Sequence, residues 1–512
     1  MLHLVTQASK YLMILLFMVY TFECFHVFRF DDQPKKQMTI YKKQRTIMYA
    51  IHFDAFLVIY MNTENIQVIG FYLMQLVLFI GIGMVYHFFY KRASELLLNN
   101  MLMLLSISFV ILTRISFDKA FKQFLILVVA TVISLLIPVI LQKITALYTF
   151  TWVYALVGIL ALSVVLVAGA VSYGAKLSIS IAGISIQPSE FVKILYVFYI
   201  ASMLQKTTEL RQLAITSVFA AIHVLILAAS KDLGSALLYF VVYLVMIYAA
   251  TRKFYYFAGG IGAAALAAFA GYKLFSHVQV RVLAWKDPLR LIDKEGYQIS
   301  QSLFAIGTGG WFGMGLCQGL PNKIPVVAQD FIFSAISEEM GGIFALCLIM
   351  VCVSCFFMFL NIAMKMKDPF YKLVALGLGT VYAFQVFLTI GGVTKFIPST
   401  GVTLPLISYG GSSLLSTMIL FGIIQGLYIM KSQEIIGKRQ EACEQTKRQE
   451  RTVMPKKVKK TDMREEMKKG DAGDRGTRKA KTRTKTGAGQ TGKAKETAGK
   501  KPKIQRNHTG SK

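Results

Sequence analysis

The segment AISEEMGGIFALCLIMVCVSCFFMFL, residues 335–360, decides the fold, because it is predominantly apolar and carries no charge after Glu339. A helix needs about 20 mostly apolar residues to cross a hydrocarbon core of roughly 30 Å, and this segment is long enough. Cys352 and Cys355 form a C-x-x-C pair without the strand–helix context of a redox motif, so we expect both to be packing residues. The segment predicts a membrane-spanning helix.

Twelve further segments share this apolar character, which predicts about 13 spans in all. They are residues 11–28, 47–62, 68–89, 97–113, 122–141, 150–170, 189–204, 213–229, 235–250, 255–274, 371–391 and 410–430. Hydrophobic residues make up 55% of the 512-residue chain and charged residues 16%, against about 25% in soluble domains. We therefore predict an all-α polytopic membrane protein. Its first apolar segment is interpreted as a retained span, because no small-residue cleavage site follows it.

The net charge of +29 is concentrated outside the apolar segments. Residues 431–512 hold 26 Lys and Arg against 10 Asp and Glu, and such a tail cannot bury a core, so we expect it to be disordered. A solvated anchor near anionic lipids is the favoured role of this tail, with partner docking as the alternative. Nucleic-acid binding is least favoured, because no base-stacking aromatic residues accompany the lysines.

Lys and Arg in the short loops predict the orientation of the chain. The richer set of alternate loops comprises residues 29–45, 91–92, 143, 206–211, 252–253 and 365–372, together with the tail. This side and the C-terminus are therefore predicted to be cytoplasmic, and an odd number of spans puts the N-terminus outside. Residues 275–334 form a long extracytoplasmic loop, whose aromatic and aliphatic content favours ordered structure over a disordered connector.

Ionisable groups at membrane depth are costly and usually mark function, and four polar sites stand out. In the first, Glu190 and Lys193 are spaced i,i+3 on one face of a helix that begins near Pro188. They form an ion pair that either fixes the helix or holds a substrate. In the second, Asp232 precedes an apolar segment, where capping of the following helix is favoured over a direct role in the site.

The third site is Asp330, which stands directly before the apolar run Phe331-Ile332-Phe333. Reduced solvation raises the pKa of a carboxylate and suits a general base, so helix N-cap and catalytic base are equal alternatives for Asp330. Glu338 and Glu339 follow within ten residues. Three carboxylates this close in sequence predict a group that binds a divalent cation or shares protons.

The fourth site is residues 396–413, FIPSTGVTLPLISYGGSS, in which prolines and glycines break any continuous helix. Broken backbone at membrane depth is tolerated only when it lines a cavity or is buried in protein. Hydroxyl groups for such a polar wall come from Thr400, Ser408, Tyr409 and Ser412, among others. In the predicted topology all four sites lie near the extracytoplasmic face, which indicates a site that opens outward next to lipid.

The same segments resemble the SEDS family of bacterial cell-wall proteins, the FtsW/RodA/SpoVE group. The matching runs, in the family's order, are QPSEFVK (187–193), DLGSALL (232–238), YQISQSLFAIGTGGWFGMGL (297–316), DFIFSAISEEMGG (330–342) and IPSTGVTLPLISYGGSS (397–413). The resemblance implies a ten-helix core over residues 97–430. About three extra N-terminal spans in residues 1–96 and the basic tail, residues 431–512, lie outside that core.

The resemblance also implies an activity, namely a peptidoglycan glycosyltransferase in the bacterial cytoplasmic membrane. Such proteins polymerise lipid II into a glycan strand at the outer face, together with a class B penicillin-binding protein that crosslinks the product. The essential aspartate of the family falls on Asp330. Arg281, Lys395 or a divalent cation, Mg²⁺ or Mn²⁺, would balance the pyrophosphate charge, and Gln298 belongs to the candidate substrate-binding set.

The chain departs from the family pattern in a few positions. Val326 and Ala328 stand where the family often carries acidic and histidine residues before the aspartate, Ser178 replaces a usual tryptophan, and Thr389 stands where asparagine is common. A lipid II flippase and a non-catalytic scaffold are the rival functions. The motifs do not separate roles in division, elongation and sporulation.

Overall fold

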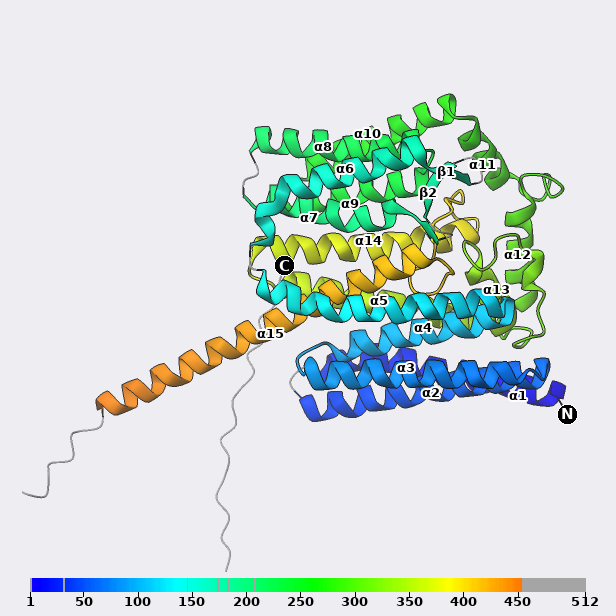
Figure 1. The fold of residues 1–512 in the computed structure, drawn as a ribbon, viewed down its shortest axis with the longest axis horizontal. Helices are drawn as coiled ribbons and strands as arrows, with labels where there is room; N and C mark the ends of the chain where they lie inside the picture. The colour runs from blue at the N-terminus through cyan, green and yellow to red at the C-terminus, as the bar shows by residue number, and fades with distance from the viewer. Residues whose placement is uncertain are drawn as a thin grey trace, which may run out of the picture. The chain divides into compact units, whose positions relative to one another are not determined.

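The computed structural model describes residues 2–30, 33–144, 146–172, 175–181, 184–206 and 209–453, and these are nearly all helical (Figure 1). The helices are α1 (Leu2–His26), α2 (Pro34–Thr63), α3 (Ile66–Phe89), α4 (Glu95–Ile115), α5 (Phe117–Lys143), α6 (Thr151–Ala168), α7 (Pro188–Leu204), α8 (Leu210–Ala229), α9 (Leu233–Thr251), α10 (Phe254–Leu274), α11 (Ser276–Lys286), α12 (Tyr297–Gly309), α13 (Ile332–Lys365), α14 (Pro369–Val393) and α15 (Gly411–Val453). Short 3₁₀ turns are η1 (Val27–Phe30), η2 (Leu147–Phe150) and η3 (Pro321–Lys323).

Each of the 13 predicted spans overlaps one of these helices. Within the described ranges, eleven helices are long and apolar enough to cross a membrane. The two predicted spans outside this group are α7, which has only 17 residues, and α2, whose apolar half is interrupted by His52 and Asp54. The multi-pass, predominantly helical architecture is therefore confirmed.

Helix α4 lies inside the bundle, between the N-terminal helices and α5 (Figure 1). Every residue from Leu96 to Thr113 is buried, although the helix carries amide and hydroxyl side chains. Asn100 accepts a hydrogen bond from Tyr20 of α1 at 3.0 Å and donates one to Ser354 of α13 at 3.0 Å. Polar groups of this kind hold neighbouring helices together in lipid, so α4 joins the extra N-terminal spans to the rest of the bundle.

The loop predicted for residues 275–334 is ordered, as its composition indicates. It contains α11, α12 and η3, and between the last two the chain turns through glycines of positive φ at Gly310, Gly313 and Gly315. Lys10 of α1 donates a hydrogen bond to the Gly313 carbonyl at 3.1 Å, so the first helix contacts this glycine turn directly.

A small antiparallel sheet between α6 and α7 was not predicted. Its strands β1 (Ala170–Ser172), β2 (Ala175–Ile181) and β3 (Ile184–Ile186) pair in chain order, with Ser180 opposite Ser185. The alternation of apolar and polar residues in AKLSISI is typical of a strand, and it is the signal that the all-helical interpretation missed.

The predicted disorder of the tail is wrong for its first residues, because α15 continues through residues 431–453. This stretch is rich in Glu, Gln, Lys, Arg and Ala, which are strong helix formers, and it lacks proline. The remainder of the predicted tail, residues 454–512, lies outside the described residues.

Candidate active site

Asp330 is the central candidate, and the structure excludes one of its two predicted roles. The N-cap of α13 is Phe331, and no side chain caps this helix, so the N-cap alternative for Asp330 is wrong. The reason is local: the Asp330 amide bonds back to the Val326 carbonyl at 3.2 Å, and the chain enters the helix only one residue later. The Asp330 carboxylate accepts no hydrogen bond from any residue in the described part of the chain.

Burial raises the pKa of Asp330 to about 6, and the nearby positive charge of Arg281 acts in the opposite direction. A carboxylate with a pKa in this range is ionised at neutral pH and still basic enough to accept a proton during a reaction. The Arg281 guanidinium is held in place by the Ser399 carbonyl at 3.3 Å. The predicted desolvation of Asp330 is therefore present.

The broken segment between α14 and α15 is packed against the residues that precede Asp330. The Tyr409 amide donates to the Ala328 carbonyl at 2.7 Å, and the Ser408 hydroxyl donates to the Gln329 carbonyl. The same Ser408 oxygen accepts a hydrogen bond from the Leu404 amide at 3.0 Å. Ser408 and Tyr409 thus position the backbone around Asp330.

Gly401 lies in the middle of this segment, opposite Asp330. A Cβ atom at Gly401 would lie 3.7 Å from Oδ2 of Asp330, and φ is +72° at this residue, a conformation suited to glycine. The Thr400 hydroxyl oxygen next to it is buried and has no partner among the described residues. Gly401 therefore leaves open backbone opposite the carboxylate, and the adjacent Thr400 carries a buried hydroxyl group without a described partner.

Helix α11 closes one side of this region. In addition to the Arg281 contact, Trp285 donates its indole N–H to the Lys395 carbonyl at 3.1 Å. Lys395 is half-buried and adopts a positive φ of 61°. Arg281 therefore lies close enough to Asp330 to act on its charge, and the backbone of Lys395 is tied to the same helix α11. Gln298, the second residue of α12, is also half-buried, but it forms no hydrogen bond with another described residue.

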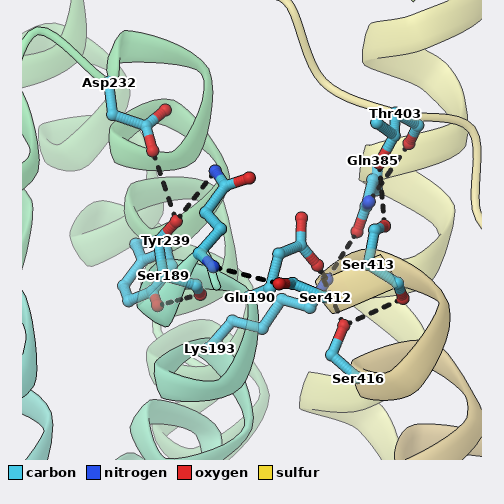
Figure 2. Close-up of polar contacts among 11 residues, drawn as sticks. Ser189, Glu190, Lys193, Asp232, Tyr239, Gln385, Thr403, Ser412, Ser413 and Ser416 are labelled. Carbon is cyan, nitrogen blue, oxygen red and sulfur yellow. Dashed lines mark hydrogen bonds and ion pairs between the residues drawn. The ribbon is translucent and has the colours of Figure 1, made fainter. Parts of the chain in front are cut away.

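The predicted ion pair between Glu190 and Lys193 is confirmed, and it is part of a buried network (Figure 2). Lys193 also donates to Gln385 of α14 at 2.9 Å, and Ser416 of α15 donates to Glu190 at 2.9 Å. Gln385 in turn donates to the Thr403 carbonyl of the broken segment at 3.1 Å. The pair therefore joins three helices and reaches the segment that faces Asp330.

Asp232 caps α9 as predicted, because its Oδ1 accepts the Ser235 amide at 3.1 Å. Its other carboxylate oxygen accepts the Ser189 hydroxyl at 3.3 Å, and Tyr239 donates to the Ser189 carbonyl at 2.8 Å (Figure 2). Ser412 accepts the Gln187 amide at 3.0 Å and so ties α15 to the start of α7. These residues organise the helix ends around the broken segment.

Glu338 and Glu339 do not join Asp330, which corrects the predicted three-carboxylate group. Glu338 accepts the Leu320 amide at 3.0 Å, and Glu339 accepts the Cys317 amide at 3.3 Å and pairs with Arg114 at 3.0 Å. Both side chains are buried in α13 under the glycine turn, whereas Asp330 precedes the helix. Over the described ranges, no group of three or more His, Cys, Asp or Glu could hold a metal ion.

Several residues of the site were not predicted. Gln385, Ser416 and Arg114 lie in or beside apolar segments and connect the predicted residues to one another. The available signal was their polarity at membrane depth, the same criterion that singled out Glu190. Cys352 and Cys355 are buried free thiols, as expected of packing residues.

Comparison with known proteins separates the N-terminal helices from the region that holds the site. Residues 86–433, which include all of the site, match the FtsW/RodA/SpoVE family, described as cell cycle proteins. The chain belongs to this family. The predicted resemblance is therefore confirmed. Helices α1 and α2 and most of α3 precede the matched region of this FtsW/RodA/SpoVE protein.

Individual relatives agree with this assignment. The peptidoglycan glycosyltransferase RodA of Mycobacterium tuberculosis strain H37Rv is 39% identical over 267 residues, which is 49% of this chain and 57% of that protein. The stage V sporulation protein E of Bacillus subtilis is 34% identical over 270 residues, 50% of this chain and 72% of that protein. The match thus spans little more than half of the mycobacterial relative.

A solved structure shows the same fold. It comes from a study of the structural coordination of polymerization and crosslinking by a peptidoglycan synthase complex. The TM-score is 0.57 at 23% identity, with 67% of this chain and 99% of that chain covered. The helical arrangement of this FtsW/RodA/SpoVE protein is therefore shared with a chain of that complex.

Proposed function

We propose that this protein is a peptidoglycan glycosyltransferase that polymerises lipid II into glycan strands. The observation that carries the proposal is the Asp330 carboxylate, which is half-buried, accepts no hydrogen bond from the described residues and has a pKa of about 6. A structural carboxylate at such a depth normally has hydrogen-bond partners, as Asp232 and Glu339 do. A carboxylate without such partners is free to accept a proton from a bound substrate.

In the proposed glycosyl transfer, one proton moves, one bond forms and one bond breaks. Asp330 accepts the proton of the 4-hydroxyl group of the acceptor sugar, and the freed oxygen attacks the anomeric carbon of the donor. The bond from that carbon to the lipid pyrophosphate breaks, and the lipid pyrophosphate leaves with the bonding electrons. Gly401 leaves room for a sugar beside the carboxylate, and the Thr400 hydroxyl supplies a hydrogen bond to it.

The negative charge of the leaving pyrophosphate needs a positive group. Arg281 acts on the Asp330 charge and bonds to the Ser399 carbonyl, so it is the first candidate, and Lys395, at the start of the broken segment, is the second. A divalent cation is the alternative. Asp330 is the only carboxylate described at this position, so the described residues alone do not form a cation site, and Arg281 and Lys395 balance the charge in the proposed reaction.

The relatives support this assignment, because the mycobacterial protein is named a peptidoglycan glycosyltransferase. The solved relative comes from a complex that couples polymerization to crosslinking, which supports a class B penicillin-binding protein as the partner of this chain. The distribution of basic loops supports an active site at the outer face of the cytoplasmic membrane and a cytoplasmic C-terminus. Roles in division, elongation and sporulation share this chemistry.

The test is polymerisation of lipid II by the purified full chain with its cognate penicillin-binding protein. Asp330→Asn should abolish polymer, whereas Asp293→Asn, the same change at an exposed aspartate of the same loop, should retain it. Equal polymer from Asp330→Asn and the wild type would exclude Asp330 as the base. Transbilayer movement of lipid II with no polymer from any variant would favour the flippase, and neither activity would favour the scaffold.

A further inference from the structure

A cavity of about 530 Å³ lies far from Asp330, where the ends of α3 and α5 meet α15. Its lining includes Ile429 of α15, which lies 18 residues beyond the start of that helix at Gly411. At 1.5 Å per residue this distance is about 27 Å, the thickness of the hydrocarbon core. The cavity and the proposed active site are therefore near opposite faces of the membrane.

The rim of the cavity is strongly positive. Lys91, Arg92 and Lys143 line it, and their exposed side chains form no ion pair with any residue that the structure describes. Among the residues that the structure describes, no carboxylate lines the cavity. Glu434, the acidic residue that follows the lining residue Gln433, pairs instead with Lys367 at 3.5 Å. Three cations converge here without a counter-charge from the described chain.

The wall beside these cations is apolar and aromatic. Phe88 and Phe89 line the cavity and are 73% and 69% exposed, and Val139 and Ile429 extend the same wall. A small soluble anion would contact only the rim and leave this surface unused. An amphiphile with an anionic head and hydrocarbon chains satisfies both parts of the cavity.

Hydrogen bonds hold the walls of the cavity in position. The Tyr90 hydroxyl donates to the Leu135 carbonyl, which attaches the end of α3 to α5. Gln433 of α15 donates to Gln142 of α5 at 3.2 Å and closes the other side. The cavity is thus formed by three helices tied to one another rather than by a single exposed loop.

We propose that this cavity binds the phosphate headgroup of an anionic phospholipid. Lys91, Arg92 and Lys143 contact the phosphate, and the acyl chains lie along Phe88, Phe89 and Val139. Basic pockets between membrane helices on the cytoplasmic side are suited to such headgroups, and these cations belong to the loops predicted to be cytoplasmic. The site is independent of the polymerase reaction, so its test does not use that activity.

Native mass spectrometry of the full chain in detergent measures the binding, with phosphatidylglycerol and phosphatidylcholine added in separate titrations. Lys91→Gln/Arg92→Gln/Lys143→Gln should weaken phosphatidylglycerol binding about a hundredfold, from the contribution of three basic residues near a lipid surface. The matched control, Lys206→Gln/Arg211→Gln/Lys372→Gln, removes three exposed charges from loops on the same predicted side and should bind like the wild type.

Further variants separate folding and ligand class. Lys91→Arg/Lys143→Arg keeps the charges and should retain binding, which excludes misfolding as the cause of a loss. Phe88→Ser/Phe89→Ser should weaken phosphatidylglycerol binding and leave binding of inorganic phosphate unchanged. Equal affinity for the two lipids, unchanged binding in the triple glutamine variant, or phosphate bound as tightly as the lipid would each overturn the proposal.

Discussion

Ser408 donates a hydrogen bond to the carbonyl oxygen of Gln329, the residue directly before Asp330. The contact joins the broken segment to the start of α13, although the two residues are 79 positions apart in the chain. The Tyr409 amide makes a second bond to Ala328. The position of the Asp330 carboxylate therefore depends on the broken segment, and changes in that segment should affect the reaction.

The activity should rise as pH increases through about 6. The pKa of Asp330 is raised to about 6 by burial, and only the ionised carboxylate can accept the sugar proton. Initial rates of lipid II polymerisation between about pH 5 and pH 8 measure this dependence. A rate that does not change across this range would contradict the role of Asp330 as the base.

The same carboxylate should destabilise the folded protein at neutral pH. Its pKa is higher in the folded chain than the ordinary value of 3.8, so its contribution to stability is present at low pH and lost as pH rises through about 6. Asp330→Asn should therefore raise the free energy of unfolding at pH 8 by at most about 3 kcal/mol, and it should make little difference near pH 4. Melting temperatures at the two pH values measure this effect. Asp293→Asn serves as the exposed control.

Removal of Lys193 should be more damaging than removal of the whole ion pair. Lys193→Met leaves the buried Glu190 charge with only the Ser416 hydroxyl, at a cost of about 3–5 kcal/mol. Glu190→Gln/Lys193→Met removes both charges and should restore part of this loss. Melting temperatures in detergent compare the variants, and a double variant less stable than Lys193→Met would refute the expectation.

Arg114 should hold the glycine turn against α13. It pairs with Glu339 and donates to the Gly319 carbonyl at 3.1 Å, so Arg114→Gln should cost about 3 kcal/mol and expose the turn to solvent. Hydrogen exchange at the amides of Cys317 and Leu320 reports this change. Lys119→Gln, an exposed cation near the start of α5, should leave the exchange unchanged.

Substitutions of Thr400 and Thr389 should have different effects, the first on polymerisation and the second on stability. The Thr400 hydroxyl has no described partner, so Thr400→Val should lower polymerisation by about tenfold or more without lowering the melting temperature. Thr389 donates to the Val402 carbonyl at 2.9 Å, so Thr389→Val should cost about 1 kcal/mol of stability instead. Loss of stability in Thr400→Val with unchanged specific activity would contradict this assignment.

Some features could be predicted because they depend on a short stretch of chain. The apolar segments predict the helices, since each needs only length and composition to cross a bilayer. The pairing of Glu190 with Lys193 follows from their i,i+3 spacing on one helix, and the cap formed by Asp232 follows from its position before an apolar run. The broken segment is visible in its prolines and glycines.

Other predictions failed where distant parts of the chain decide the outcome. Glu338 and Glu339 are close to Asp330 in sequence, but they face the glycine turn and Arg114. The small sheet between α6 and α7 is a different case, because its strands pair only with one another and the local alternation in AKLSISI already indicates a strand.

The sequence by itself determined the multi-pass helical class, the local ion pair and cap, and the candidate base. Only the tertiary structure decided that Lys193 reaches Gln385, that Ser408 holds the residue before Asp330, and that the Asp330 carboxylate has no described hydrogen-bond partner. Residues spaced i,i+3 or i,i+4 share one face of a helix, so contacts within one helix can be predicted from residue spacing alone. Contacts between helices depend on how their faces pack, and residue spacing along one chain does not specify that packing.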